Sequence, residues 1–305
     1  MKTDTISARR CTIAVLAAGC LWGTMGFWRR GMEAIGLSTV DCMGVRVGTA
    51  ALLYLLTILI LEPSALKIRL KDLWCFLGSG VLSLLVFGLC YFRAMQLMSL
   101  STAAILLYTA PVFVILLSVP LFREELSTLK LGAMVLAFLG CCLVCGLGGG
   151  EKITIQGLLL GLGSGFCYAL YSIFSRFALN KGYSSLSITF YSSLFAFIGA
   201  LAISGGKTFP AMFSSFGNVL FCLLAGFVSA YLAYMLYTYG LKGLDNGKAS
   251  IMASIEPVVA TLVGVFIYGE VLSLSGFLGI VLVLAAIVLL NLKTNKTTDI
   301  QAPDI

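Results

Sequence analysis

The feature that most constrains this chain is a series of ten apolar segments, each about as long as a membrane-spanning helix. A helix crosses the hydrocarbon core of a bilayer with about 20 predominantly apolar residues. We predict spanning helices at residues 12–29, 39–61, 73–95, 100–121, 128–147, 156–177, 184–204, 216–240, 247–268 and 273–291. The gaps between them are too short for a soluble domain. The predicted fold class is therefore an all-α integral membrane protein with ten transmembrane helices.

Composition supports this assignment and excludes other classes of protein. Of the 305 residues, 60% are hydrophobic and 11% are charged, whereas about a quarter are charged in soluble domains. A soluble globule and a nucleic-acid-binding module are thereby excluded. The chain has no histidine, which removes Ser-His-Asp catalysis and histidine-ligated metals. We predict no enzymatic activity, no catalytic residues, no cofactor and no metal site.

Two further motifs bear on chemistry. Ten cysteines lie almost entirely in apolar segments, where we expect small packing residues. Cys142 and Cys145 have the spacing of a metal or redox pair, but they lie in the lipid-compatible sequence LGCCLVCGL. The chain has no glycine-rich phosphate loop ending in Lys-Ser or Lys-Thr, which argues against ATP-driven transport by this chain alone.

The distribution of Lys and Arg predicts the orientation in the membrane. Ten spans place both termini on one side, and basic residues concentrate in cytoplasmic loops. If the termini are cytoplasmic, fourteen Lys and Arg lie inside and five outside, and Arg46 lies within the second span. Arg29 and Arg30 oppose this bias without reversing it. We predict a multi-pass protein of the cytoplasmic membrane with cytoplasmic N- and C-termini.

An internal repeat determines the predicted architecture. A shift of the chain against itself by 146 residues, without gaps, aligns identical residues from the first span to the ninth, and Trp22 meets Tyr168. The identical pairs include Gly19/Gly165, Arg30/Arg176, Gly36/Gly182, Ser38/Ser184, Ala103/Ala249, Ile105/Ile251, Pro111/Pro257, Glu124/Glu270, Leu126/Leu272 and Ser127/Ser273. The predicted halves are 1–147 and 152–305, joined by Gly148-Gly149-Gly150, and the second half ends in a short polar, disordered tail.

Each half contains five spans, so the second half enters the membrane from the opposite side. Such an inverted-topology repeat is typical of secondary transporters. Two similar halves of opposite orientation can form inward-open and outward-open states of comparable energy, and exchange between them is alternating access. A structural membrane protein has no evident need for this symmetry.

Three segments carry a family resemblance. LAAGCLWGTMGFWRR, LLYTAPVFVILLSVPLFREELS and its counterpart SIMASIEPVVATLVGVFIYGEVLS resemble the drug/metabolite transporter superfamily, EamA type. The resemblance covers essentially the whole chain. It implies ten helices in an inverted repeat, with spans 1–4 and 6–9 around a central cavity and spans 5 and 10 at the periphery. Members of the family transport amino acids, amines, nucleotide sugars, nucleobases and toxic compounds, and many export them from the bacterial cytoplasm. Arg123-Glu124-Glu125 departs from the usual Gly-Glu step.

Pro111 and Pro257 lie within the fourth and ninth spans. A proline removes one helical hydrogen bond and frees a carbonyl four residues back, near Leu107 and Ala253. In lipid, such carbonyls must be bonded by neighbours or face a wet cavity. Either the two prolines form bends that line the substrate path and act as gate hinges, or the bends are static and improve packing.

Glu256 and Arg46 are charged residues about two turns into their spans. A carboxylate at that depth costs several kcal/mol unless it is paired, protonated or hydrated. Glu256 is either a counter-ion or proton-coupling site or a structural carboxyl group, and by helical geometry it does not share the face of Ser254. Arg46 either binds a carboxylate or phosphate of the substrate or forms an ion pair with Asp41 or Glu256.

Aromatic residues and glycines form a second group of candidates. Trp22 and Tyr168 are mid-span, repeat-equivalent and on glycine-rich stripes, and Tyr108 also falls within a span. Small residues at four-residue spacing either let helices pack closely or open room for substrate beside an aromatic wall. Glu124 and Glu270 end their spans at equivalent places, where we expect each to cap the helix that follows.

These patterns predict a secondary-active transporter of a small organic metabolite, an exporter of an amino acid or related compound that works by alternating access. The alternative is an exporter of organic cations or toxic amines, and the rivals of another class are a membrane enzyme or a channel. The predicted partners are a small-molecule substrate, the lipid bilayer and a coupled proton or counter-substrate. The candidate cavity residues are Trp22, Arg46, Tyr108, Tyr168, Ser254 and Glu256, and the candidate bends are Pro111 and Pro257.

Overall fold

The computed structural model describes residues 7–146 and 154–292, and these residues form helices and loops without strands. The ten predicted spans are confirmed as ten helical stretches long and apolar enough to cross a membrane. Their bounds are Ala8–Ile35, Thr39–Leu61, Leu70–Leu97, Thr102–Phe122, Thr128–Cys145, Ile155–Asn180, Ser185–Ser204, Phe216–Gly240, Asn246–Tyr268 and Leu274–Asn291. The glycine linker and the polar tail lie outside the described residues.

Several spans consist of more than one helix. In chain order the α-helices are α1 Ala8–Gly23, α2 Met25–Ile35, α3 Thr39–Leu61, α4 Leu73–Leu77, α5 Phe87–Met95, α6 Leu100–Leu107, α7 Ala110–Phe122, α8 Thr128–Cys145, α9 Ile155–Asn180, α10 Ser185–Ser204, α11 Phe216–Gly226, α12 Ala233–Gly240, α13 Asn246–Ala253, α14 Glu256–Tyr268 and α15 Leu274–Leu292. Short 3₁₀ turns are η1 Pro63–Leu66, η2 Leu70–Asp72 and η4 Phe209–Ser214. Two π-helical segments, η3 Gly78–Val86 and η5 Phe227–Leu232, interrupt the third and eighth spans.

Helix starts recur at repeat-equivalent residues. Ser38 and Ser184 each cap their helix by accepting a hydrogen bond from the N–H three residues on, and Ser99 and Asp245 do the same. Such caps satisfy N–H groups that have no partner inside the helix. The irregularities recur as well, because residues 81–86 of η3 correspond to residues 227–232 of η5 after the 146-residue shift.

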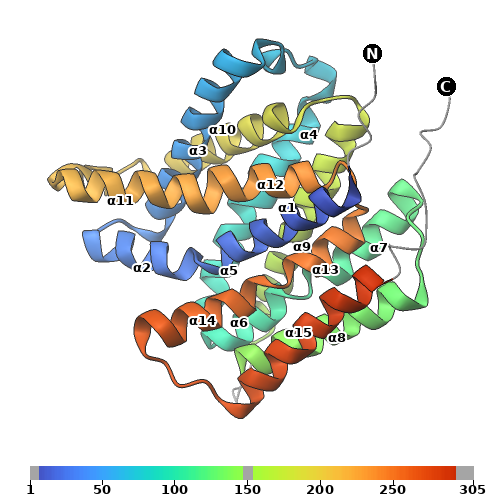
Figure 1. Cartoon of the computed structure of the whole chain (residues 1–305). Helices are drawn as coiled ribbons and strands as arrows, with labels where there is room; N and C mark the ends of the chain where they lie inside the picture. The colour runs from blue at the N-terminus through green and yellow to red at the C-terminus, as the bar shows by residue number, and fades with distance from the viewer. Residues whose placement is uncertain (1–6, 147–153, 293–305) are drawn as a thin grey trace.

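The two halves pack as one body. α3 lies against α10 and α8 against α15, so that equivalent helices of the two halves touch. α8 and α15 lie side by side at one edge of the bundle, as the family resemblance implies (Figure 1). The main apolar core therefore draws residues from both halves, including Tyr54, Tyr171 and Met252.

The bundle has two ends, which fix the positions used below. α1 begins and α15 ends at the same end, which we call the proximal end (Figure 1). Chain order places Glu124 and Asp245 at the proximal end as well. The loop after α2 and the loop between α14 and α15, which contains Glu270, lie at the opposite, distal end (Figure 1).

Candidate functional site

Two spans are interrupted at the same point of the repeat. The fourth span breaks at residues 108–109 between α6 and α7, and the ninth breaks at 254–255 between α13 and α14. Pro111 and Pro257 follow in the first turn of α7 and α14, where the missing N–H of proline removes no helical bond. The structure therefore has a break at each predicted bend, two to three residues before the proline.

Glycines of α1 and α9 lie against the carbonyl groups at these breaks. A Cβ atom at Gly165 would lie 2.8 Å from the Leu106 carbonyl oxygen, and one at Gly19 would lie 3.1 Å from the Ala253 carbonyl oxygen. The hydroxyl of Thr109 also donates to the Leu106 carbonyl at 2.6 Å. Glycine is thus needed for close helix packing at these two positions, which is one of the two alternatives for the glycine stripes.

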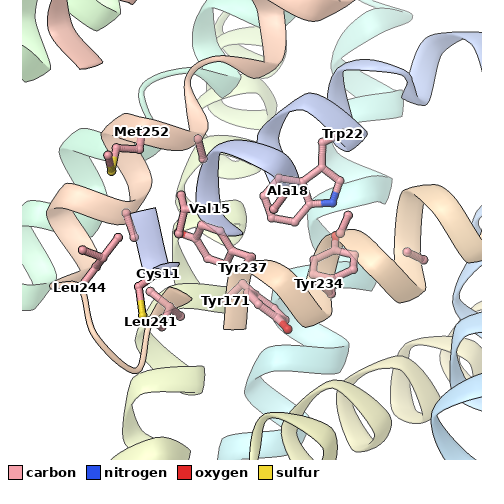
Figure 2. Close-up of a cluster of buried hydrophobic side chains, with 14 of the residues drawn as sticks. Cys11, Val15, Ala18, Trp22, Tyr171, Tyr234, Tyr237, Leu241, Leu244 and Met252 are labelled. Atoms are coloured by element: carbon pink, nitrogen blue, oxygen red, sulfur yellow. The ribbon is translucent and has the colours of Figure 1, made fainter. Parts of the chain in front are cut away.

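An aromatic cluster forms part of the main buried core (Figure 2). Its members are Trp22 of α1, Tyr168 and Tyr171 of α9, and Tyr234 and Tyr237 of α12. The Trp22 ring centroid lies 5.1 Å from that of Tyr234, 5.2 Å from that of Tyr237 and 6.1 Å from that of Tyr168. The edge-on and tilted arrangements are those that aromatic pairs favour. The structure thus brings the repeat-equivalent candidates Trp22 and Tyr168 together.

A buried polar atom of the aromatic cluster lacks a hydrogen-bond partner in the described part of the chain. The hydroxyl of Tyr171 bonds to Thr238 and that of Tyr237 to Ser172, both at 2.8 Å. The indole N–H of Trp22 is buried and has no hydrogen-bond partner among the described residues. The space between these rings has room for about one water molecule. Admission of a larger molecule therefore requires the rings to move.

Glu256 lies beside this cluster at the start of α14. The hydroxyl of Tyr168 donates to its Oε2 atom at 3.2 Å. Within the described part of the chain, no Lys or Arg lies within ion-pair distance of this carboxylate. Glu256 is therefore a membrane-embedded carboxyl group whose side-chain partner is a neutral hydroxyl.

Arg46 of α3 binds the π-helical segment η5. Its Nε donates to the Ser229 hydroxyl at 2.8 Å, and an Nη donates to the Ser229 carbonyl oxygen at 3.1 Å. The ion pair with Asp41 or Glu256, one of the two alternatives for Arg46, is not formed in this conformation. Asp41 accepts hydrogen bonds from the backbone N–H and hydroxyl of Thr208, and Glu256 accepts one from Tyr168. π-helical segments are frequent at functional sites, since they leave carbonyl groups available.

The remaining two cavity candidates lie at the breaks. Ser254 is buried where α13 ends, two residues before Glu256. Tyr108 ends α6 and packs against an apolar cluster that includes Cys141, Ile255 and Val258, apart from the aromatic cluster. Trp22, Tyr168, Glu256 and the aromatic residues of α12 thus form the candidate site. Arg46 lies on α3 and is bonded to Ser229 of η5.

A second polar constellation closes the proximal end of the bundle. Glu124 follows α7, and its carboxylate accepts hydrogen bonds from the backbone N–H groups of Asn246 at 2.7 Å and Gly247 at 3.2 Å. Lys130 of α8 lies 3.4 Å from Glu124 and 2.8 Å from Asp245. The prediction that Glu124 caps the next helix is wrong, because Ser127 already caps α8 and Glu124 reaches across to α13 of the other half.

Two further contacts tie the same end together. Arg176 of α9 donates to the side-chain oxygen of Asn246 at 3.0 Å and to the Leu244 carbonyl oxygen. The Asn246 amide donates to Ser118 of α7 at 3.1 Å. Burial raises the pKa of the Glu124 carboxyl group, and the charge of Asp245 adds to this effect.

The equivalent residues at the distal end are arranged differently. Glu270 has its side chain 56% exposed, and its ion-pair partner among the described residues is Arg30 at 3.6 Å. The expected cap of the following helix is wrong here too, because the Ser273 hydroxyl accepts from Gly276 at the start of α15. The carboxylate instead folds over Gly264, where an added Cβ atom would lie within 2.5 Å of it.

Sequence reasoning missed several residues of both constellations. Ser229 and Asn246 are unremarkable in the sequence, and their roles depend on contacts between the halves that no pattern specifies. The signal for Arg176 was present, because it matches Arg30 in the repeat alignment. In the described ranges, no group of three or more Cys, Asp or Glu residues is placed to hold a metal ion.

Comparison with known proteins agrees with this architecture. The model of the EamA-like transporter family matches residues 9–146 and again residues 155–292. An uncharacterized transporter of Archaeoglobus fulgidus is 34% identical over 65% of this chain and 70% of its own. The uncharacterized inner membrane transporter YicL of Salmonella typhimurium is 25% identical over 95% of this chain and 98% of its own.

A solved structure has the same fold. A protein crystal structure superposes with a TM-score of 0.77 and 17% sequence identity, and it covers 95% of this chain and 100% of its own. The chain belongs to the EamA-like transporter family, and it is a multi-pass membrane transporter. The offset between the two matched ranges, 155 minus 9, is 146, the same as the shift of the internal repeat.

Proposed function

We propose that the protein is a secondary-active exporter of a small amphoteric metabolite, an amino acid or related compound, which it moves by alternating access between two inverted five-helix halves. The observation that carries this proposal is the Tyr168–Glu256 contact, a carboxyl group held by a neutral hydroxyl within the membrane. An ionisable group in a membrane span is expensive and marks a substrate or ion pathway.

Arg46 supplies the complementary charge. Its guanidinium is bonded to Ser229, a neutral residue, so its charge has no ion-pair partner among the described residues. A ligand with an ammonium and a carboxylate group neutralises both residues, because Glu256 attracts the first and Arg46 binds the second. The unpaired indole N–H of Trp22 provides a third contact for a ligand acceptor.

An organic cation is the second candidate, supported by the aromatic cluster beside Glu256. Ring faces attract cations, and Tyr168 links the cluster directly to the carboxylate. For this class of ligand, Arg46 is a repulsive charge rather than a binding group. The two candidates therefore differ in whether a carboxylate on the ligand is required.

A thermal-shift screen of the purified protein tests this proposal. Ligands that bind the folded form raise its stability, by about 2.7 kcal/mol at a hundred times Kd. We expect amino acids to raise the melting temperature more than matched amines that lack the carboxylate. An equal shift by the amines supports the organic-cation alternative, and the absence of any shift contradicts both candidates.

Transport in proteoliposomes separates a carrier from a channel. A carrier with alternating access shows saturable counterflow, in which unlabelled ligand inside accelerates the entry of labelled ligand. A channel shows flux without counterflow. We expect counterflow, and export is tested by comparing wild-type efflux from loaded cells with that of cells lacking the protein.

A further inference from the structure

The two ends of the bundle differ although the sequence repeats. At the proximal end, α13 packs against α7, α8 and α9. The equivalent contacts at the distal end would join α6 to α14, α15 and α2, and none of these pairs packs comparably among the described residues. The proximal end is therefore closed, whereas α6 stands apart from α14, α15 and α2 at the distal end.

Each end of the bundle carries one of two repeat-equivalent glutamates, Glu124 and Glu270. Glu124 bonds to the backbone N–H groups of Asn246 and Gly247, the first two residues of α13. The shift of 146 residues carries Glu124 onto Glu270 and residues 246–247 onto 100–101, the first two residues of α6. First-turn N–H groups of a helix lack partners inside the helix and attract negative charge.

The arginines repeat as well. Arg176 bonds to the carbonyl group of Leu244 just before α13. The shift of 146 residues carries Arg176 onto Arg30 and Leu244 onto Met98, which lies just before α6. In this structure Arg30 lies over the ring of Tyr268, 4.3 Å from the centroid, and 3.6 Å from Glu270. Arg30 and Glu270 at the distal end thus lie next to each other, and the partners that they bind are not residues of α6.

We propose that Glu124 and Glu270 are alternating latches, each of which closes one end of the transporter by capping the broken helix of the opposite half. When the proximal end opens, Glu124 leaves α13, and Glu270 with Arg30 engages the N-terminus of α6. This inference rests on the proposed alternating access, and it assigns the residues that hold each state.

Hydrogen–deuterium exchange of the full-length protein in lipid nanodiscs, without substrate, tests the latches. The readouts are peptides that cover residues 244–250 and 98–105. Loss of the two carboxylate bonds in Glu124→Ala is expected to accelerate exchange at 244–250 by about ten-fold or more. Exchange at 98–105 is expected to slow in the same variant, because the distal latch then closes.

Three controls keep the result specific. Glu125→Ala alters the exposed neighbouring carboxylate and is expected to leave both peptides unchanged. Glu124→Ala combined with Glu270→Ala is expected to lose the slowing at 98–105 while the acceleration at 244–250 remains. Glu124→Gln retains one acceptor oxygen and is expected to show a smaller effect of the same sign, which serves if the alanine variant folds poorly.

Faster exchange at 244–250 with no change at 98–105 overturns the proposal, since it indicates a local cap without coupling. Unchanged exchange at 244–250 overturns it as well. Because the readout needs no substrate, a failed flux or binding assay with an intact exchange response counts against the proposed substrate alone.

Discussion

Glu124 and Glu270 are separated by one repeat length of 146 residues, yet their side chains are 9% and 56% exposed. The first is bonded to the backbone of α13 and to Lys130, and the second lies at the surface beside Arg30. Identical positions in the repeat thus occupy two different environments, as expected for a carrier trapped with one end closed.

A pH dependence follows from the burial of Glu124. Its pKa is raised in the closed proximal end by burial and by Asp245, although Lys130 and the N–H groups of Asn246 and Gly247 oppose the shift. In an open end the carboxyl group meets water, and its pKa returns toward the ordinary value of about 4.3. The closed form therefore binds more protons, and a rise in pH through this window favours opening.

The measurement is exchange at residues 244–250 from about pH 5 to about pH 8, expressed relative to Glu124→Gln so that the intrinsic pH dependence cancels. The other charged groups at this end, Arg176, Lys130, Lys248 and Asp245, are present in both proteins. We expect the ratio of wild-type to variant exchange to rise with pH. A falling or constant ratio contradicts the claim that deprotonation of Glu124 opens the proximal end.

Gly165 is predicted to be intolerant of any side chain. In Gly165→Ala, the added Cβ atom meets the Thr109 hydroxyl at 2.7 Å and the Leu106 carbonyl oxygen at 2.8 Å. Overpacking of this kind costs about 1–3 kcal/mol, which lowers the melting temperature. The matched control is Gly163→Ala in the same helix, because nothing lies within 4 Å of its added Cβ atom. Equal melting temperatures of the two variants argue against close packing at the break.

Arg46 distinguishes the two substrate candidates. Arg46→Gln removes the positive charge, so we expect transport of a carboxylate-bearing substrate to fall about ten-fold or more, whereas an organic cation is carried at least as well. Arg93→Gln is the matched control, since Arg93 is exposed and bonded to Gln96. An equal loss for both classes of substrate indicates that Arg46 only holds η5 in place.

Membrane orientation is predicted from the basic residues. A cysteine substituted for Lys207 in a distal loop is expected to react with an impermeant thiol reagent added to intact cells, whereas one substituted for Lys67 in a proximal loop is not. The wild-type protein measures the background from its ten native cysteines. The reverse pattern places the proximal end outside and contradicts the proposed export.

Residues with a strong local signal were predictable from the sequence. The ten spans follow from apolar length alone, and the breaks near Pro111 and Pro257 follow because proline is disfavoured in a helix interior and tolerated in the first turn. The repeat identified Trp22 and Tyr168 as equivalent candidates, although it did not predict that their rings lie next to each other. These features depend on the chain near each residue or on similarity between halves.

Contacts between the halves were not predictable. Glu124 was expected to cap its own next helix, but Ser127 performs that role, and the carboxylate reaches a helix start 122 residues away in sequence. Arg46 was expected to find a carboxylate, but η5 offers it a carbonyl and a hydroxyl group closer by. The asymmetry between Glu124 and Glu270 belongs to one conformational state, and a repeating sequence cannot specify which state is occupied.

The role of Glu256 is the central claim, and flux per folded molecule in Glu256→Gln tests it most directly. The amide keeps the shape of the side chain and an acceptor for the Tyr168 hydroxyl, so the variant is expected to fold and insert normally. Glu125→Gln, at an exposed proximal position, is the matched control. The account predicts that counterflow in Glu256→Gln collapses or loses its pH dependence while Glu125→Gln behaves as wild type. Flux like that of the wild type at two pH values would place Glu256 in the scaffold and contradict the account.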